Sequence, residues 1–197
     1  MNELATNSSS DLEYSVMRDL NHMRVRHHLD FNRQWKSLTN EIPSVVRTPE
    51  DASHSKQPFD YVLLCVKALP DVYDIANIIE SVVSPQHTCI LMNTTHSLGV
   101  ETYLEQRFPT NIVLSLVSGA EVMQIGASDF EHRGATEVWV GSANKNSSIP
   151  ASIQTDMAEA LAMTLSSGQV NCKVSSNIRQ QQFERMIGLV NWLNPQF

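Results

Sequence analysis

Glycine is scarce in this sequence and absent from its first 98 residues. The chain holds seven glycines among 197 residues, and the first of them is Gly99, whereas glycine makes up roughly 7% of an average protein. A phosphate-binding turn of the form G-x-G-x-x-G or G-x-x-x-x-G-K-[ST] needs glycine at fixed positions. No such turn can therefore lie ahead of Gly99.

Basic charge is also in short supply. Lys and Arg number 14 against 21 Asp and Glu, which gives a formal net charge of −7. The stretch richest in basic residues, 17–36, is interrupted by Asp19 and Asp30. A nucleic-acid-binding protein needs a basic surface to meet the phosphates, so we expect no nucleic-acid partner.

Cysteines are few, and long apolar runs are missing. Cys65, Cys89 and Cys172 form an odd set without C-x-x-C spacing, which favours a reducing compartment. Cys65 and Cys89 lie in apolar runs, where we expect buried thiols acting as small hydrophobic side chains. No run approaches the roughly 18 apolar residues of a membrane span, and the N-terminus has no signal-peptide pattern. We expect a soluble, cytoplasmic protein that does not contact membranes.

The first 57 residues are polar and poorly patterned. The spacing of Leu12, Val16 and Leu20 predicts a helix around residues 11–22, and residues 42–46 predict a short strand. His22, His27, His28 and Asp30 match no established metal-ligand spacing. We therefore predict no metal site there.

From residue 59 the pattern becomes regular. Apolar runs predict strands at 61–66, 88–92 and 112–117, and helical spacing predicts helices at 71–83 and 100–108. Strands that alternate with helices at short intervals pair in parallel through right-handed crossovers. The predicted fold class is α/β, with a doubly wound parallel sheet of the Rossmann type.

The remaining elements are shorter. Residues 128–141 predict two short strands flanking the turn at Arg133 and Gly134. An amphipathic helix follows at 153–165 and a strand at 170–174. A last helix begins near Asn177.

Candidate binding residues follow the predicted strands, because ligands of open parallel sheets bind at the carboxyl ends of the strands. Lys67 comes directly after the first strand and could meet a phosphate or ribose; it could equally be a surface lysine. The loop after the second strand is rich in polar side chains. It could hold a cofactor amide or carboxylate, or it could simply cap the next helix. These loop residues are Asn93, Thr94, Thr95, His96 and Ser97.

Five segments taken together resemble the ketopantoate reductase family (2-dehydropantoate 2-reductase), in particular its fungal-type members. Residues 59–67 are similar to the family's strand that ends in lysine, and residues 89–101 to its "QNG-x-G-x-E" loop. Residues 117–121 are the third of these segments. Residues 130–141 are similar to the family's "H-x-G-x-G-x-x-x-I-G" segment. Residues 177–185 look like the opening of the family's helical domain. The resemblance covers about residues 40–188.

This resemblance implies NADPH-dependent reduction of a 2-oxo acid, ketopantoate, to pantoate on the pantothenate pathway. It implies a partial Rossmann-like NADP-binding domain at 58–175, and the beginning of a C-terminal helical domain at 176–197. Lys67 takes the position of a cofactor-contacting lysine. The family's loop asparagine, which touches cofactor and substrate, aligns with His96 if Gly99 and Glu101 fix the register. The same asparagine aligns with Asn93 if the end of the strand fixes the register instead.

The chain also departs from the family pattern. It lacks the glycine-rich turn that seats the pyrophosphate, and Arg185 stands where the family has its catalytic lysine. A guanidinium is too weak an acid to donate a proton in such a reaction, although Arg185 could still bind a substrate carboxylate.

We therefore expect an oxidoreductase truncated at both ends, with impaired catalysis and no measurable thermal stabilisation by NADPH. The alternative is a non-catalytic fragment or paralogue that acts as a binding or interaction module. An uncovered sheet edge or the terminal helix could support a homo-oligomer.

Overall fold

The computed structural model describes residues 24–27, 46–53, 57–67, 69, 71–126, 129–133, 136–143, 148–168 and 170–193. The chain divides into two compact units, described separately below. One comprises Met1–Ala52 and Glu121–Gly134, and the other Ser53–Ala120 and Ala135–Phe197. The predicted helix at 11–22 lies outside the described residues, and so does most of the predicted strand at 42–46.

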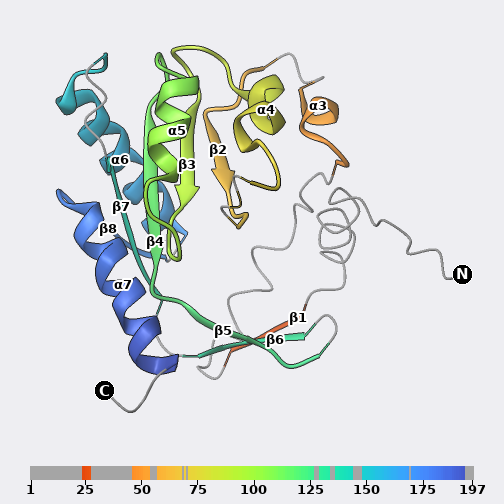
Figure 1. Cartoon of the computed structure of the whole chain (residues 1–197), viewed down its shortest axis with the longest axis vertical. Coiled ribbons are helices and arrows are strands. Elements are labelled where there is room, and N and C mark those ends of the chain that lie inside the picture. Colours follow the sequence, from red (N-terminus) through yellow and green to blue (C-terminus); the bar gives the residue numbers. More distant parts are fainter. Residues whose placement is uncertain are drawn as a thin grey trace, which may run out of the picture. The chain divides into compact units, whose positions relative to one another are not determined.

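A five-stranded mixed sheet forms the centre of the second unit (Figure 1). Its strands, in spatial order, are β2 (Tyr61–Leu64), β3 (Cys89–Asn93), β4 (Val113–Ser118), β7 (Glu137–Gly141) and β8 (Asn171–Val174). Strands β2, β3 and β4 are parallel, which confirms the predicted pairing. Strand β7 runs antiparallel to β4, and β8 runs parallel to β7.

Helices cover both faces of this sheet. On one face pack α4 (Ile75–Ile79), which continues into the 3₁₀ turn η3 (Glu80–Val82), and α5 (Val100–Arg107). On the other packs α6 (Ala151–Ser167). Helix α7 (Ile178–Leu193) lies against β4 and β7. This is the doubly wound α/β architecture expected from the alternation of strands and helices.

The side chains of β3 show why both faces are covered. Successive residues of a strand point to opposite faces. Ile90 and Met92 join the core under α4 and α5, whereas Cys89 and Leu91 join the core under α6. All four are at most 3% exposed, so a continuous apolar run correctly predicted a strand buried on both sides.

Strand β2 behaves differently from the prediction. Its apolar run was also expected to be buried on both faces, but Leu63 is 53% exposed and only Leu64 is buried. In the described part of the chain β2 pairs with β3 alone, so neighbouring strands shield it on one side. Cys65, which follows β2, is exposed rather than buried as expected.

Asp74 explains where α4 begins. The helix was predicted from residue 71, but it starts at Ile75 because the Asp74 carboxylate accepts hydrogen bonds from the N–H groups of Ala76 and Asn77, at 3.0 and 3.2 Å. The Tyr103 hydroxyl also donates to Asp74, at 2.6 Å. These bonds cap α4 and tie it to α5.

Asp74 gives a prediction about pH. The hydrogen bond from Tyr103, with the two backbone bonds and the nearby Arg107, lowers the pKa of the Asp74 carboxyl below its ordinary 3.8. A lowered folded-state pKa stabilises the fold above the ordinary value, and this contribution is lost as the pH falls through the folded pKa. Asp74→Asn should therefore lower the melting temperature at about pH 7, and the difference should shrink towards about pH 3. Asp71→Asn, at an exposed position outside the helix, should show no such trend, and parallel pH profiles for wild type and Asp74→Asn would contradict the assignment.

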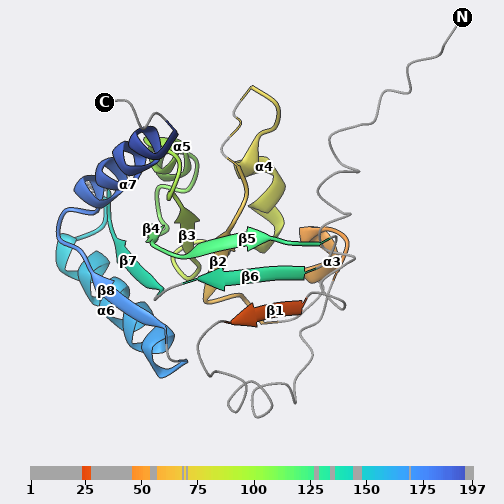
Figure 2. The same ribbon diagram turned by 90° about the horizontal axis from the view of Figure 1, so that it is seen from below.

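The first unit contains a three-stranded sheet and a short helix, α3 (Pro49–Ala52). The strands, in spatial order, are β1 (Arg24–His27), β6 (Asp129–Arg133) and β5 (Glu121–Gln124). Figure 2 shows them side by side, with β1 parallel and β5 antiparallel to β6. Both strands predicted within 128–141 exist, as β6 and β7, but they belong to different sheets.

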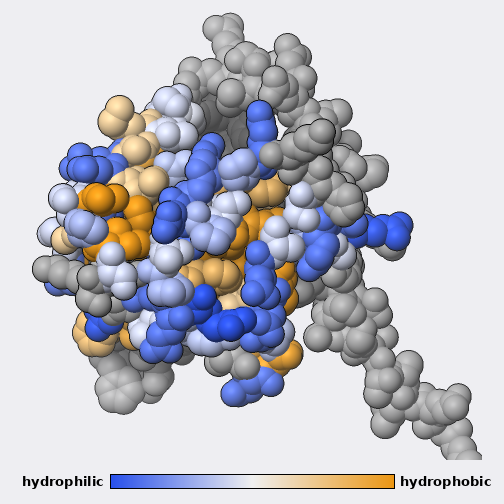
Figure 3. All heavy atoms as spheres, turned by 90° about the horizontal axis from the view of Figure 1, so that it is seen from above, coloured by the Kyte–Doolittle hydropathy of each residue, from blue (hydrophilic) through white to orange (hydrophobic). Residues whose placement is uncertain are grey.

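The surface mixes polar and apolar side chains. One face, shown in Figure 3, has small groups of apolar side chains between hydrophilic ones. Large apolar residues that are more than half exposed include Val72, Val122 and Phe183. Within the described residues, no helix combines the length and the apolar composition needed to cross a bilayer.

Candidate functional site

The carboxyl ends of three parallel strands meet at one edge of the five-stranded sheet. In parallel sheets this edge is where ligands bind, because the loops that follow the strands gather there. Lys67 follows β2, Asn93 is the last residue of β3, and Ser118 is the last residue of β4. Lys67 and Asn93, two of the predicted site residues, therefore lie at the same edge of the sheet.

Asn93 is the predicted residue that the fold holds most firmly. Its side-chain oxygen accepts a hydrogen bond from the Thr95 N–H at 3.1 Å and another from the Thr95 hydroxyl at 2.6 Å. The Thr95 hydroxyl oxygen in turn accepts the N–H of Ser118 at 2.9 Å. The amide of Asn93 is thus fixed through Thr95 to the end of the neighbouring strand β4.

Cys65 lies beside Asn93, because β2 and β3 are paired in register up to Leu64 and Met92. Desolvation by surrounding protein atoms raises the pKa of the Cys65 thiol, and a hydrogen bond from the Asn93 side chain acts in the opposite direction. The Asn93 amide group therefore directs its NH₂ towards Cys65. No sequence motif distinguishes this cysteine from a buried core residue.

Lys67 and His96 are both exposed. Neither hydrogen-bonds to Asn93 or to Arg185 in the described part of the chain. Lys67 stands at the carboxyl edge of the sheet as predicted, and His96 lies on the loop between β3 and α5. The structure thus brings Asn93 into a bonded network and leaves the other two loop candidates at the surface.

Arg185 lies on α7 and is half-buried. Its Nε atom is buried, and no group in the described residues hydrogen-bonds to it. Buried donors are nearly always paired, so this guanidinium is suited to a ligand that brings an oxygen acceptor. Arg185 could bind a carboxylate in this way.

Gln182 connects α7 to the carboxyl edge of the sheet, three residues before Arg185. It is fully buried, and its side-chain nitrogen shares its two protons among three buried oxygen atoms. These are Thr94 Oγ1 at 2.8 Å, Ser115 Oγ at 3.3 Å and Glu101 Oε1 at 3.4 Å. The sequence pattern does not single out Gln182, because a glutamine in a polar helical segment is typical of a solvent-exposed position.

Two further oxygen atoms of this buried cluster have no hydrogen-bond partner in the described part of the chain: Glu101 Oε2 and Gln182 Oε1. With Arg185 Nε they make three buried polar atoms without a partner on or beside α7. A bound ligand or water reaching this region would supply what they lack.

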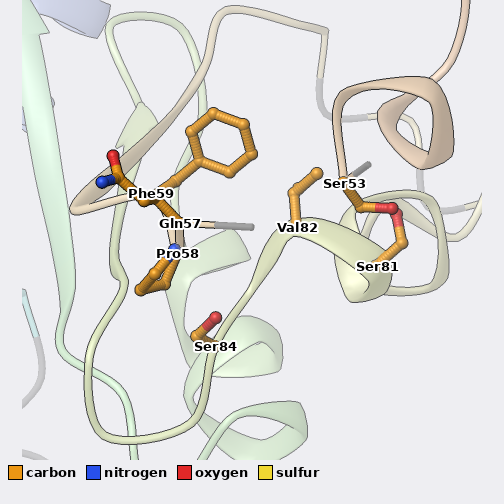
Figure 4. A pocket seen from close by; sticks show the side chains of 7 residues that line it. All are labelled: Ser53, Gln57, Pro58, Phe59, Ser81, Val82 and Ser84. Carbon is orange, nitrogen blue, oxygen red and sulfur yellow. The ribbon is translucent and has the colours of Figure 1, made fainter. Parts of the chain in front are cut away.

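A separate pocket of about 320 Å³ lies elsewhere in the second unit (Figure 4). Its lining residues precede β2 or lie between α4 and β3, at the amino ends of the strands: Ser53, Gln57, Pro58, Phe59, Ser81, Val82 and Ser84. This is the edge remote from Asn93, so the pocket does not belong to the candidate site. In the described residues, no group of three or more His, Cys, Asp or Glu side chains is arranged to hold a metal ion.

Structural comparison identifies similar folds. The 2-dehydropantoate 2-reductase from Geobacter metallireducens matches with a TM-score of 0.57 and 19% identity, over 83% of this chain and 48% of that chain. The 2-dehydropantoate 2-reductase from Porphyromonas gingivalis matches with a TM-score of 0.53 and 16% identity, over 84% of this chain and 51% of that chain. At these identities the likeness establishes the fold.

Sequence comparison gives closer relatives. The chain is 36% identical over 173 residues to the meiotically up-regulated gene 72 protein of Schizosaccharomyces pombe, covering 84% of this chain and 29% of that protein. It is 26% identical over 135 residues to an uncharacterized protein of the same yeast, covering 68% of this chain and 23% of that protein. The chain therefore spans less than a third of the length of these two relatives.

A family model decides the assignment. The model of ketopantoate reductase PanE/ApbA matches residues 14–145 of the 197. This range includes β2, β3 and the Asn93 loop. It also reaches into the polar N-terminal segment, which the sequence motifs had not included. The chain belongs to the ketopantoate reductase PanE/ApbA family of oxidoreductases.

Proposed function

We propose that this chain contributes to NADPH-dependent reduction of a 2-oxo acid of the ketopantoate type, a reaction of the pantothenate pathway. The observation that carries the proposal is the amide of Asn93, fixed at the carboxyl edge of the sheet with its oxygen on Thr95 and its NH₂ on the side of Cys65. Family membership supplies the reaction class. The buried, unpartnered Nε of Arg185 supplies a place for the carboxylate of the substrate.

The residues at the carboxyl edge fit the nicotinamide and ribose of the cofactor better than its pyrophosphate. Asn93 can donate to a carboxamide or carbonyl oxygen, and the exposed Lys67 can meet a phosphate or a ribose hydroxyl. The seat for the pyrophosphate is missing from this sequence, because no glycine precedes Gly99. A bound dihydronicotinamide would supply the hydride of the reduction. We accordingly propose that this chain by itself binds NADPH weakly.

Arg185 has a different role from the lysine that the family pattern places there. A guanidinium group donates hydrogen bonds without releasing a proton. It can orient a substrate carboxylate through two parallel N–H bonds. We propose that Arg185 binds the substrate. Because it is a poor general acid, proton transfer to the carbonyl oxygen is inefficient and turnover is slow. His96 remains the second proposed contact to substrate and cofactor.

Arg185→Lys tests this proposal. A lysine at this position restores an ammonium group that can act as a general acid, which contributes about 10²- to 10⁴-fold in rate. We expect the variant to oxidise NADPH in the presence of ketopantoate at least about tenfold faster than the wild type, measured by absorbance under saturating substrate. Arg107→Lys, at an exposed position of α5, should leave the rate unchanged.

The same assay separates the proposal from its alternative. If NADPH binds, as followed by its fluorescence, and neither the wild type nor Arg185→Lys turns over, the chain is a non-catalytic binding module. The scarcity of glycine and the arginine at position 185 are the sequence features that favour this alternative. If NADPH does not bind at all, the proposed cofactor is wrong for this chain.

We also propose a cytoplasmic location and self-association. The pantothenate pathway reaction needs NADPH, and free cysteines suit a reducing compartment. In the part of the chain that the structure describes, apolar side chains are exposed at β2, where Leu63 lies, and on α7, which carries Phe183 and Ile187. Either surface could meet a second copy.

A further inference from the structure

We propose that Thr95 is a positioning residue, whose hydroxyl fixes the Asn93 amide at the carboxyl edge of the sheet with its oxygen on Thr95 and its NH₂ on the opposite side, towards Cys65. As a result Asn93 offers a hydrogen-bond donor, and the group it recognises is an acceptor oxygen of a ligand. The identity of that ligand, a carboxamide or 2-oxo acid, rests on the proposed function. The orientation of the Asn93 amide rests on its contacts with Thr95 alone.

The orientation follows from the chemistry of the contacts. A backbone N–H can only donate, so the Asn93 atom 3.1 Å from the Thr95 nitrogen must be the amide oxygen. The Thr95 hydroxyl reaches the same oxygen at 2.6 Å. Two donors therefore converge on one side of the amide, and the NH₂ is left on the other side, where Cys65 lies.

The Thr95 hydroxyl is itself held in one orientation. Its oxygen accepts the N–H of Ser118 at 2.9 Å, so its proton is free to point at Asn93. Thr95 is only 6% exposed, which keeps competing water away. A chain of hydrogen bonds thus runs from the backbone of β4 through Thr95 to the Asn93 amide, and each bond in such a chain strengthens the next.

The neighbouring residue, Thr94, ties the same loop to β4 and α7. The Thr94 N–H donates to the Leu116 carbonyl at 2.8 Å, and the Thr94 hydroxyl accepts from buried Gln182. Thr94, which lies between Asn93 and Thr95, therefore anchors this part of the loop to β4 and α7.

Thr95→Val is the informative substitution. Valine has nearly the shape of threonine, but it replaces the hydroxyl with a methyl group. A carbon atom approaches an oxygen no closer than about 3.3 Å, so the methyl must push the Asn93 oxygen out of the place it occupies at 2.6 Å from Thr95 Oγ1. The NH₂ is displaced with it.

Cys65 reports this displacement without any ligand. Desolvation raises the pKa of its exposed thiol, and the Asn93 side chain beside it acts in the opposite direction, towards the reactive thiolate. Loss of this interaction raises the thiol pKa and slows alkylation. Cys172 is an internal reference for loosening of the fold, and burial raises the pKa of the Cys89 thiol to about 12, which makes it inert.

Thr88→Val is the matched control. Thr88 is buried at the other end of β3, and its hydroxyl makes the same pair of bonds as that of Thr95: it accepts the Ser84 N–H at 2.9 Å and donates, here to the Phe59 carbonyl, at 2.8 Å. The two valine variants should lose similar stability. Only one of them touches Asn93.

The experiment measures iodoacetamide alkylation of each cysteine by mass spectrometry at about pH 8. We expect Cys65 to react at least about threefold more slowly in Thr95→Val than in the wild type, with Thr95→Ser restoring the rate and Thr88→Val leaving it unchanged. An unchanged Cys65 rate in Thr95→Val, or equal slowing in Thr88→Val, would overturn the assignment. NADPH titration of the same proteins separates the two proposals: if the wild type does not bind, the proposed cofactor fails, while the alkylation rates still decide the role of Thr95.

Discussion

Gly141→Ala is expected to lower the free energy of unfolding by about 3 kcal/mol or more, because overpacking against a backbone that cannot move is among the most costly substitutions. A Cβ atom at position 141 would collide with the carbonyl oxygen of Ser175 and lie 3.4 Å from the Cβ of Ile178. The Ser175 backbone cannot withdraw, because its N–H is bonded to the Val140 carbonyl at 2.8 Å. Urea denaturation followed by circular dichroism measures the effect.

Gly188→Ala is the matched control for this substitution. Gly188 lies within helix α7, and an added Cβ would have no neighbour within 4 Å. Glycine in a helix costs about 0.5–1 kcal/mol relative to alanine, so this variant should be more stable than the wild type by that amount. If both alanine variants changed stability in the same direction, the close approach of Ser175 to Gly141 would be wrong.

Gln182→Ala is expected to be the second large loss, about 2–4 kcal/mol. It leaves a cavity, and it removes the donor of three buried oxygen atoms, one of which belongs to the Glu101 carboxyl group. Because Gln182 joins α7 to Thr94 in the loop of the candidate site, the variant should also bind ligand less tightly. Equilibrium unfolding in urea gives the first effect.

Gln180→Ala, on the same helix, tests whether the loss depends on burial. Gln180 is exposed and its side chain reaches only Glu184, one turn further along, at 2.8 Å. Such surface pairs contribute a few tenths of a kcal/mol, so the variant should remain within about 0.5 kcal/mol of the wild type. A loss below about 1 kcal/mol for Gln182→Ala would show that the buried amide does not hold α7 in place.

The regular part of the fold could be predicted because its information is local. The apolar runs of β3 and β4 and the helical spacing of α5 and α6 are visible within short windows of sequence, and the structure confirms each of these elements. The beginning of α4 was predicted too early, because the Asp74 cap competes with the apolar pattern. Strand β5 was not predicted, since its short, exposed segment carries no alternation that distinguishes it from a loop.

The candidate site was predicted only in outline. That Lys67 and Asn93 follow parallel strands was enough to place both at the same edge of the sheet. The environment of Cys65 was predicted wrongly, because an apolar run cannot reveal that its strand has a neighbour on one side only. Gln182 was missed because its partners lie far away in sequence; Thr94 is separated from it by 88 positions.

The sequence alone determined the order of strands and helices, the α/β class, the resemblance to ketopantoate reductases and the lack of a glycine-rich turn ahead of Gly99. All of these depend on residue type and on spacing over a few turns or strands. Only the tertiary structure decided that Asn93, rather than His96, is held by a hydrogen-bond network, and that a buried glutamine joins α7 to the same loop. These depend on pairs of residues brought together by parallel strand pairing and helix packing, which act between segments too distant for any local pattern to record.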